Sequence, residues 1–499
     1  MYIQKVVPNL YRDSVSLMQL SATLGKLPGV ERASAIMATP ANIDLLREAG
    51  LLDGSVAASP NDLLVALRGK SAAALESALA AAVAALDKPP AESAAGGPAR
   101  APLRSLQMGL AHAPGANLAL VSVPGDYAAA EAMKALRLGL NVMLFSDNVP
   151  VADEVALKRY ARAHGLLVMG PDCGTAIIDG IPLGFANAVR RGAVGVVGAS
   201  GTGTQEVTCL VHCRGAGISH AIGTGGHDLS KEVGGITMLQ GLEALARDPD
   251  TKVIVLISKP PAPEVAQKVL AAARSAGKPV VVNFIGAPQA KDGKLHYART
   301  LEEAALIAVA LLKGKSARAP TARAKAPQMK LKARQRYIRG LFSGGTFCYE
   351  ASALLGDVWS NAPVDPQRKM KDVWKSQGHT LIDLGDDVFT RGRPHPMIDH
   401  RLRNERLLQE AADPEVAVIL MDVVLGYGSH ADPAAEMIPA IRKARKKDGP
   451  AIVAFVCGTE EDPQGLERQE AALREAGVLL AESSAKAALL AAAIARKPA

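Results

Sequence analysis

A turn rich in glycine and hydroxyl residues, GVVGASGTGTQE at residues 195–206, is the clearest chemical feature of the chain. An apolar run leads into Ser200, Gly201 and Thr202, and a helix is predicted to follow. Small residues let the backbone approach a phosphate, and the first N–H groups of a helix favour an anion. The lysine of a P-loop is absent. We predict that these three residues bind phosphate; the alternative is a strand–helix turn with a Ser or Thr cap.

A second turn of the same kind precedes another predicted helix. It contains Ser343, Gly344, Gly345 and Thr346. Two helix N-termini can hold one anion from opposite sides because each carries positive dipole potential. We therefore predict that both turns contribute to one phosphate or substrate site; the alternative is two independent capped turns.

The segment FTRGRPHPMID, residues 389–399, carries two arginines separated by one glycine. The planar guanidinium forks of Arg391 and Arg393 suit a carboxylate or a phosphate, and two prolines make the loop rigid. We predict that Arg391, Arg393 and His395 orient a small substrate, and that Arg393 and His395 are catalytic.

Two further histidines lie beside glycines. His227 follows Gly226 in a GTGG run, and we predict that both bind phosphate or substrate. His296 lies in DGKLHYART and is a candidate catalytic residue.

Ligands of a doubly wound sheet bind beyond the carboxyl ends of its strands. Three residues directly follow a predicted strand and are candidates to bind a cofactor: Gly170, Pro171 and Asp172. The adjacent Cys173 has no base beside it in the sequence, which favours a structural cysteine. Cys209, His212 and Cys213 have helical spacing, but no second pair completes a set of ligands, so no metal is predicted.

Four folded segments are expected to position these residues. Alternating strands and helices predict a small α+β domain at 1–87, and βαβ spacing predicts a parallel sheet in the next segment. The third segment repeats part of the second, because RDPDTKVIVLISKPP (247–261) matches ADPEVAVILMDVVLG (412–426). Two related α/β domains in tandem follow from that repeat. Linkers are expected at 88–103 and, with basic character, at 314–334.

The net charge of +8 has a local origin. Ten basic residues and no acidic one lie between Lys313 and Arg339, so the rest of the 499-residue chain is nearly neutral. With only 3% aromatic residues, the composition disfavours nucleic-acid binding. Five cysteines are too few for a disulfide scaffold, and neither a secretory signal nor a membrane span is recognisable. A cytoplasmic protein is expected.

Residues 117–286 resemble the α subunit of succinyl-CoA synthetase in the stretches GPDCGTAI, VGVVGASGTGTQE, AIGTGGHD and KPVVVNFIG. Residues 11–51 and LGDDVFTRGRPHPMID resemble the FdrA family, and that resemblance covers nearly the whole chain. It implies a Rossmann-like CoA-binding-type domain at 104–190. It also implies two flavodoxin-like ligase-type domains, at 191–313 and 335–499.

The resemblance also assigns roles to single residues. Ser200, Gly201 and Thr202 match the turn that holds the phosphate of a phosphohistidine, and Glu206 matches a catalytic glutamate near that histidine. The Gly-His-Ala-Gly-Ala loop of the synthetases is replaced here by GAPQAKDGKLHYART, with His296 near the expected place. The glycine-rich CoA turn and an ATP-grasp domain are not recognisable, so the cofactor stays unknown, with CoA and a nucleotide as candidates.

The resemblance implies two functions, and a third, without catalysis, is also open. The first is a carbamoyltransferase subunit, which uses carbamoyl phosphate or phosphate and a small carboxylate-amide such as oxamate, in allantoin breakdown, together with two other protein subunits. The alternative is an acyl-CoA synthetase that uses ATP and CoA through a phosphohistidine at His296. The third is a scaffold that binds partners.

Overall fold

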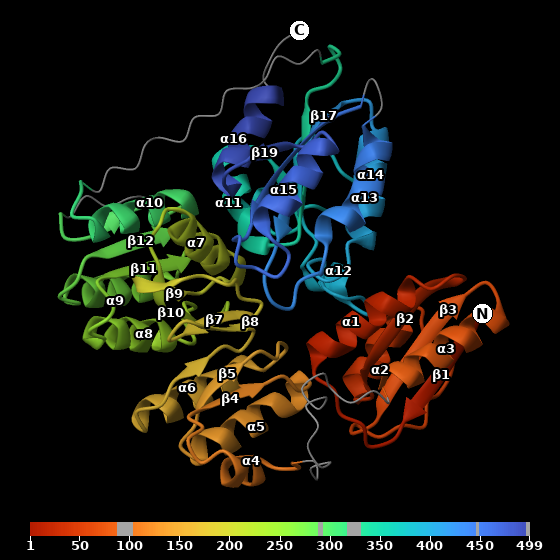
Figure 1. Cartoon of the computed structure of the whole chain (residues 1–499), viewed down its shortest axis with the longest axis horizontal. Coiled ribbons are helices and arrows are strands. Elements are labelled where there is room, and N and C mark those ends of the chain that lie inside the picture. Colours follow the sequence, from red (N-terminus) through yellow and green to blue (C-terminus); the bar gives the residue numbers. More distant parts are fainter. Residues whose placement is uncertain (87–102, 288–292, 317–330, 446–448, 496–499) are drawn as a thin grey trace. The chain divides into compact units, whose positions relative to one another are not determined.

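The computed structural model describes residues 1–86, 103–287, 293–316, 331–445 and 449–495. The predicted linkers at 88–103 and 314–334 lie largely outside the described residues. The chain forms two compact units (Figure 1): unit 1 comprises Met1–Val142 and Asp386–Asp399, and unit 2 comprises Met143–Gly385 and His400–Ala499. No described helix is long and apolar enough to cross a membrane.

Unit 1 begins with a three-stranded antiparallel sheet of order β1-β3-β2. Alternate residues of β2 and β3 point to opposite faces. One face buries Val65 and Leu67 in a core with the first and third helices, and the other buries Leu64 and Ala66 against α2. The elements are β1 (Tyr2–Val7), α1 (Ser14–Gly25), β2 (Val30–Met37), α2 (Pro40–Glu48), β3 (Leu63–Gly69) and α3 (Ala72–Leu86).

A βαβαβ segment follows and forms a sheet of order β4-β5-β6, with the boundary between the two units inside β5. The parallel α/β class predicted from the sequence is confirmed by the parallel registers of the two larger sheets described below. The elements are α4 (Leu106–His112), β4 (Leu118–Val121), α5 (Gly125–Arg137), β5 (Asn141–Leu144), α6 (Val151–Ala163) and β6 (Val168–Met169).

Unit 2 contains a seven-stranded sheet of order β13-β12-β11-β9-β10-β7-β8. Figure 1 shows α7 and α10 on one side of this sheet and α8 and α9 on the other. The elements are β7 (Thr175–Ile178), β8 (Ile181–Gly184), β9 (Arg191–Gly198), α7 (Gly201–Cys213), β10 (Ile218–Gly223), α8 (Ile236–Arg247), β11 (Val253–Ser258), α9 (Pro263–Arg274), β12 (Val280–Phe284), β13 (His296–Tyr297) and α10 (Leu301–Leu312).

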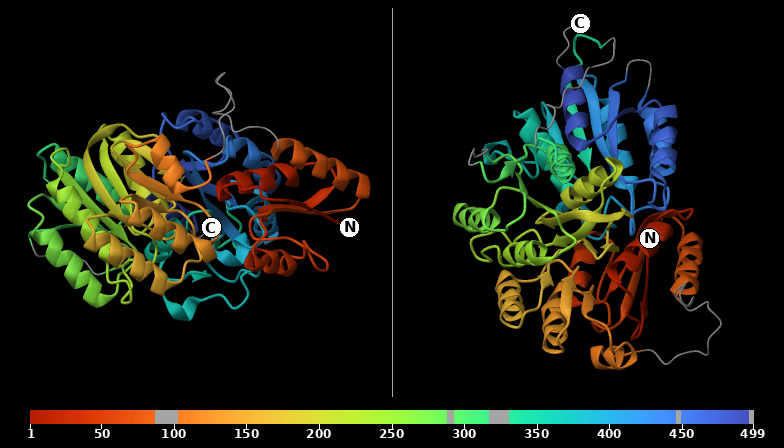
Figure 2. Two further views of the ribbon diagram at one scale, coloured as in Figure 1. Left: turned by 90° about the horizontal axis from the view of Figure 1, so that it is seen from below. Right: turned by 60° about the vertical axis from the view of Figure 1, so that its left-hand side comes forward.

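A six-stranded parallel sheet of order β15-β16-β14-β17-β18-β19 also belongs to unit 2. Figure 2 gives further views of both sheets, in yellow-green and in blue. The elements are β14 (Tyr337–Phe342), α11 (Gly345–Leu355), β15 (Trp359–Ser360), β16 (Thr380–Asp383), α13 (Arg401–Ala412), β17 (Val416–Val424), α14 (Pro433–Ala444), β18 (Ala451–Cys457), α15 (Leu466–Glu475), β19 (Leu479–Ala481) and α16 (Ser484–Ala495). A short helix, α12 (Asp387–Thr390), lies in unit 1.

The two sheets of unit 2 share one topology. In chain order, β9 to β13 without the β7–β8 hairpin form the order 2-1-3-4-5, and so do β14 and β16 to β19. This is the flavodoxin-like order, which confirms the tandem flavodoxin-like fold. The domain boundaries themselves stay predictions, and β7 of the segment 104–190 pairs with β10 beyond the expected boundary.

Candidate functional site

The N-termini of α7 and α11 meet in unit 2. The hydroxyl oxygens of Ser200 and Thr346 are 2.6 Å apart. A methyl group added to Gly203 would lie 3.1 Å from Cγ2 of Thr346, and one added to Gly344 would lie 2.9 Å from Cγ2 of Thr202. Glycine at these two positions therefore lets the first turns of the helices touch, and the two turns singled out in the sequence are brought together.

Some of the backbone N–H donors at the N-terminus of α7 are available to a ligand. Ser200 Oγ accepts a hydrogen bond from the Gly203 amide at 3.0 Å, so the residue is a helix cap. In the described part of the chain, the amides of Gly201 and Thr202 have no hydrogen-bond acceptor, as expected for the first positions of a helix. Gly201 is exposed. These two amides and the helix dipole can bind an anion from solvent.

The α11 terminus is already occupied by a carboxylate of the chain. Asp422 accepts hydrogen bonds from the Ser343 amide at 2.9 Å, from the Ser343 hydroxyl at 2.9 Å and from the Gly344 amide at 2.8 Å. Asp422 is fully buried, and Arg403 Nη1 lies 2.8 Å from its Oδ1. The prediction that Ser343 and Gly344 bind substrate phosphate therefore needs correction, because an internal ligand holds both amides. Gly345 is likewise packed against the Asp383 carboxylate.

The first half of the tandem pair lacks that internal carboxylate. When residues 247–261 are aligned with 412–426, Ile257 occupies the position of Asp422. The Ile257 side chain lies against α7, where a methyl group on Gly203 would be 3.3 Å from it. The first half therefore has an apolar side chain at the position where the second half has the carboxylate that binds its own helix N-terminus.

Two buried glutamates join the halves reciprocally. Glu206 of α7 accepts the Ser484 amide at 2.9 Å, at the start of α16, and Glu350 of α11 accepts the Leu301 amide at 2.7 Å, at the start of α10. Each glutamate thus caps the last helix of the other half. Burial raises the pKa of Glu206 to about 8 and that of Glu350 to about 7. The contacts indicate a positioning role for Glu206.

Two loops at the same sheet edge pack on each other. The Thr224 amide donates to the Gly198 carbonyl at 2.9 Å, which joins the GTGG loop to the end of β9. A methyl group on Gly225 would clash with the Pro171 carbonyl, so this loop lies directly on the Gly170–Asp172 segment, and Gly226 faces Asp172. The cofactor role of that segment stays a prediction.

A buried charge cluster anchors the GTGG loop. The Lys158 ammonium donates to Glu154 at 2.6 Å, to Asp228 at 2.8 Å and to the Thr224 carbonyl at 2.9 Å. The second oxygen of Glu154 lies 3.7 Å from Nδ1 of His227, whose side chain is 68% exposed. His227 therefore presents its other ring nitrogen to solvent with a buried carboxylate behind it.

His296 lies elsewhere in the sheet. It is on β13, an edge strand, and pairs with Val281 near the amino end of β12. Three strand spacings separate β13 from β9, or roughly 14 Å, and His296 is fixed in the ladder. The prediction that His296 acts at the α7 terminus is therefore not supported by its position.

The arginine loop belongs to unit 1. Arg391 lies 3.8 Å from Glu48, and Gly392, with φ of 64°, packs on Ala49 at the end of α2. His395 Nδ1 accepts the Met397 amide at 3.2 Å. That Arg391, Arg393 and His395 orient a substrate stays a prediction.

The cysteines have a structural character. Burial raises the pKa of Cys173 and of Cys209 to about 12, so both remain thiols at neutral pH. Among the described residues, no group of three or more His, Cys, Asp or Glu side chains has the arrangement of a metal site.

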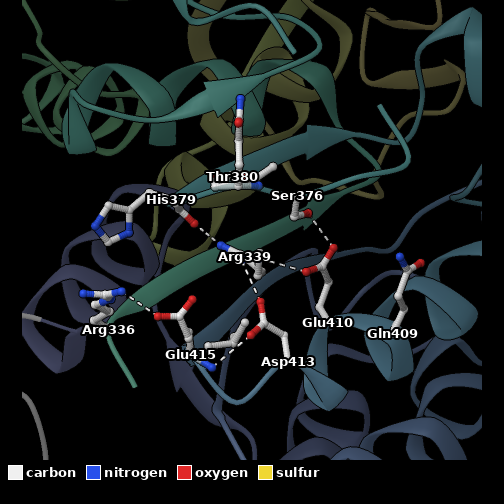
Figure 3. A network of polar contacts seen from close by, with 12 residues as sticks. Arg336, Arg339, Ser376, His379, Thr380, Gln409, Glu410, Asp413 and Glu415 are labelled. Carbon is white, nitrogen blue, oxygen red and sulfur yellow. Dashed lines mark hydrogen bonds and ion pairs between the residues drawn. The ribbon is translucent and has the colours of Figure 1, made fainter. Parts of the chain in front are cut away.

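A buried ion network in the second half includes none of the site residues predicted from the sequence (Figure 3). Arg339 lies 2.9 Å from Glu410 and 2.9 Å from Asp413, and Arg406 binds the other oxygen of Glu410 at 2.7 Å. Ser376 also donates to Glu410, at 2.6 Å. Because each charge is paired, the network anchors the long connection between α11 and β16 and offers no open site.

Three family models match the chain. A CoA-ligase model matches residues 341–494, a CoA-binding-domain model matches 189–286, and a model described as "AllF, heavy metal-associated domain" matches 1–102. The CoA-binding match falls on the first flavodoxin-like domain rather than on the segment 104–190. Residues 1–102 contain no cysteine and no histidine, so they lack the thiolate and imidazole ligands that are typical of soft-metal sites.

Relatives extend over different parts of the chain. YahF of Escherichia coli strain K12 is 48% identical and covers 97% of both chains. The succinate–CoA ligase α subunit of Staphylococcus epidermidis is 32% identical over 36% of this chain and 59% of its own. The acetyl-coenzyme A synthetase 1 structure of Ca. Korarchaeum cryptofilum covers 76% of this chain and 82% of its own at 15% identity, with a TM-score of 0.33. That score is too low to support an inference.

These matches overturn the first functional expectation. They consist of CoA-binding and CoA-ligase domains and a succinate–CoA ligase subunit, so the carbamoyltransferase assignment, with oxamate and allantoin breakdown, is wrong. The ligase alternative is the better supported of the two. The chain-long identity with YahF and the three domain matches show that the chain belongs to the FdrA family, which is similar to the succinyl-CoA synthetase α subunit.

Proposed function

We propose that the chain is an acyl-CoA ligase of the succinyl-CoA synthetase type and that unit 2 exchanges an acyl group between CoA and phosphate. The observation that carries the proposal is the meeting of the α7 and α11 N-termini, with Ser200 and Thr346 hydroxyls 2.6 Å apart. The CoA-ligase and CoA-binding family matches supply the reaction class.

The phosphate would bind at the open α7 terminus. The amides of Gly201 and Thr202 would donate to its oxygens, with the Ser200 and Thr346 hydroxyls beside them. The helix dipole would stabilise the anion without further reorganisation because the donors are fixed before it binds. Because Asp422 already accepts the amides at the α11 terminus, the site would bind one anion rather than two.

The transfer of the acyl group from CoA to phosphate consumes no nucleotide. A phosphate oxygen attacks the thioester carbonyl carbon, the new C–O bond replaces the C–S bond, and CoA leaves as the thiolate. The products are an acyl phosphate and CoA. His227 would bind the substrate anion through its exposed ring nitrogen, with Glu154 orienting the ring.

Phosphate-dependent release of CoA tests the proposal. The full chain is incubated with acetyl-CoA or succinyl-CoA, with and without inorganic phosphate, and free CoA and acyl phosphate are quantified by chromatography. We expect both products only with phosphate, and a loss of at least tenfold in Ser200→Ala and Thr346→Val. Ser105→Ala removes an equivalent cap from α4 and serves as the control. Absence of phosphate-dependent release, or equal rates in all variants, would overturn the proposal.

A further inference from the structure

Three arginines gather on one face of unit 1. Arg32 of β2 and Arg68 of β3 are direct partners in the antiparallel register, so their side chains leave the same face of the sheet. Arg393 comes from a segment more than 300 residues later in the sequence, yet it belongs to the same unit. Gly392 packs on Ala49, which brings that segment to the end of α2.

The charges of these arginines are close to one another, and among the described residues only Arg68 has a carboxylate beside it. Burial, then the nearby charges of Arg393 and Arg68, lower the pKa of Arg32. Glu31 lies 3.5 Å from Arg68 Nε. In the described part of unit 1, the Arg393 guanidinium has neither a hydrogen-bond nor an ion-pair partner. Like charges placed directly opposite each other destabilise a sheet.

Capping of α2 explains only part of this arrangement. Arg32 Nη1 donates to the Ala49 carbonyl, and Arg68 Nη1 donates to the Gly50 carbonyl at 3.4 Å. Cations at a helix C-terminus are favourable. Each guanidinium has five N–H donors, however, so these contacts leave most donors free, and they do not involve Arg393.

We propose that Arg32, Arg68 and Arg393 form an oxyanion site in unit 1 that binds the carboxylate or phosphate group of a small molecule. Guanidinium forks match both groups. The half-buried position of Arg32 and the 34% exposure of the Arg68 side chain leave the site accessible to solvent. This site is independent of the phosphate position proposed at α7, since that position lies in unit 2.

Anion-dependent thermal unfolding of the full chain tests the site. Sodium phosphate and sodium succinate are titrated separately, with sodium chloride at equal ionic strength as reference. All chains in this titration carry Ser200→Ala, so that the phosphate position proposed at α7 contributes little, and the chain with Ser200→Ala alone is the unsubstituted reference. We expect phosphate or succinate to raise the melting temperature beyond chloride, and which of them does so identifies the ligand group. In Arg393→Gln and Arg68→Gln the concentration for half the effect should rise about tenfold, as expected when one charged hydrogen-bonding partner is lost.

Arg47→Gln is the matched control, because Arg47 lies on α2 and pairs with Asp44 outside the cluster. It should titrate like the unsubstituted chain. Arg393→Gln is the decisive variant, since Arg393 makes no described side-chain contact that folding would lose. The proposal is overturned if neither anion stabilises more than chloride, or if Arg393→Gln and the unsubstituted chain give the same titration.

Discussion

The hydroxyls of Ser200 and Thr346 lie 2.6 Å apart although 146 residues separate them in the chain. A repeated domain explains this contact, because each half places a helix N-terminus at the carboxyl end of its first strand. Two positive helix ends repel each other unless anions neutralise them. Asp422 neutralises one end, and the other is open to a ligand.

Asp422→Asn should destabilise the chain by about 3 kcal/mol, because it leaves the buried Arg403 guanidinium without its counter-charge. Urea unfolding measures the loss. Asp365→Asn, at the exposed cap of a short 3₁₀ helix, should cost no more than about 1 kcal/mol. Equal losses for the two variants would show that Asp422 does not hold the α11 terminus.

Glu206→Gln should remove part of the pH dependence of stability. The folded-state pKa of about 8 lies above the unfolded value near 4.5, so the stabilisation is complete below pH 4.5 and is lost as the pH rises through 8. Between these values the free energy of unfolding should fall by about 1.4 kcal/mol per pH unit for this group. Guanidinium unfolding from pH 5 to 9 measures the slope.

Glu76→Gln, on the exposed side of α3, is the control for that slope. It should leave the pH profile unchanged. A profile of Glu206→Gln as steep as that of the unsubstituted chain would mean that the Glu206 carboxyl does not remain protonated between the two helices.

The histidines should differ in their effect on acyl exchange. His227→Ala should lower the phosphate-dependent rate at least tenfold, because His227 is exposed with Glu154 behind it and follows the GTGG loop, whose Thr224 amide donates to Gly198 at the end of β9. His296→Ala should retain most of the rate, since β13 is an edge strand away from that terminus. Release of CoA measures both. The reverse order of effects would place the reaction at β13.

The class of fold and the two turns rich in glycine and hydroxyl residues, before α7 and α11, can be predicted from the sequence alone. Glycine and hydroxyl residues after apolar strands predict helix caps from local chemistry, and the repeat of residues 247–261 at 412–426 predicts the duplicated sheet. Local patterns do not show which side chain reaches a given terminus. Asp422 is 79 residues from Ser343 in the sequence, and its position near the carboxyl end of a buried strand does not show which helix terminus it caps.

The same limit applies to Arg393 and to His296. The spacing of Arg391 and Arg393 indicated an anion site, but their association with Arg32 and Arg68 depends on a segment of the last third of the chain joining unit 1. The prediction for His296 rests on its distance in sequence from the KPVV strand. The register that fixes it beside Val281 comes from the sheet and has no local signal.

Calorimetric titration of the full chain with inorganic phosphate, compared with Ser200→Ala, Thr346→Val and Arg393→Gln, tests the central claim most directly. An open anion position at α7 predicts phosphate binding that weakens about tenfold or more in the first two variants and persists in Arg393→Gln. Phosphate binding that is unchanged in Ser200→Ala and Thr346→Val, or no binding at all, would contradict it.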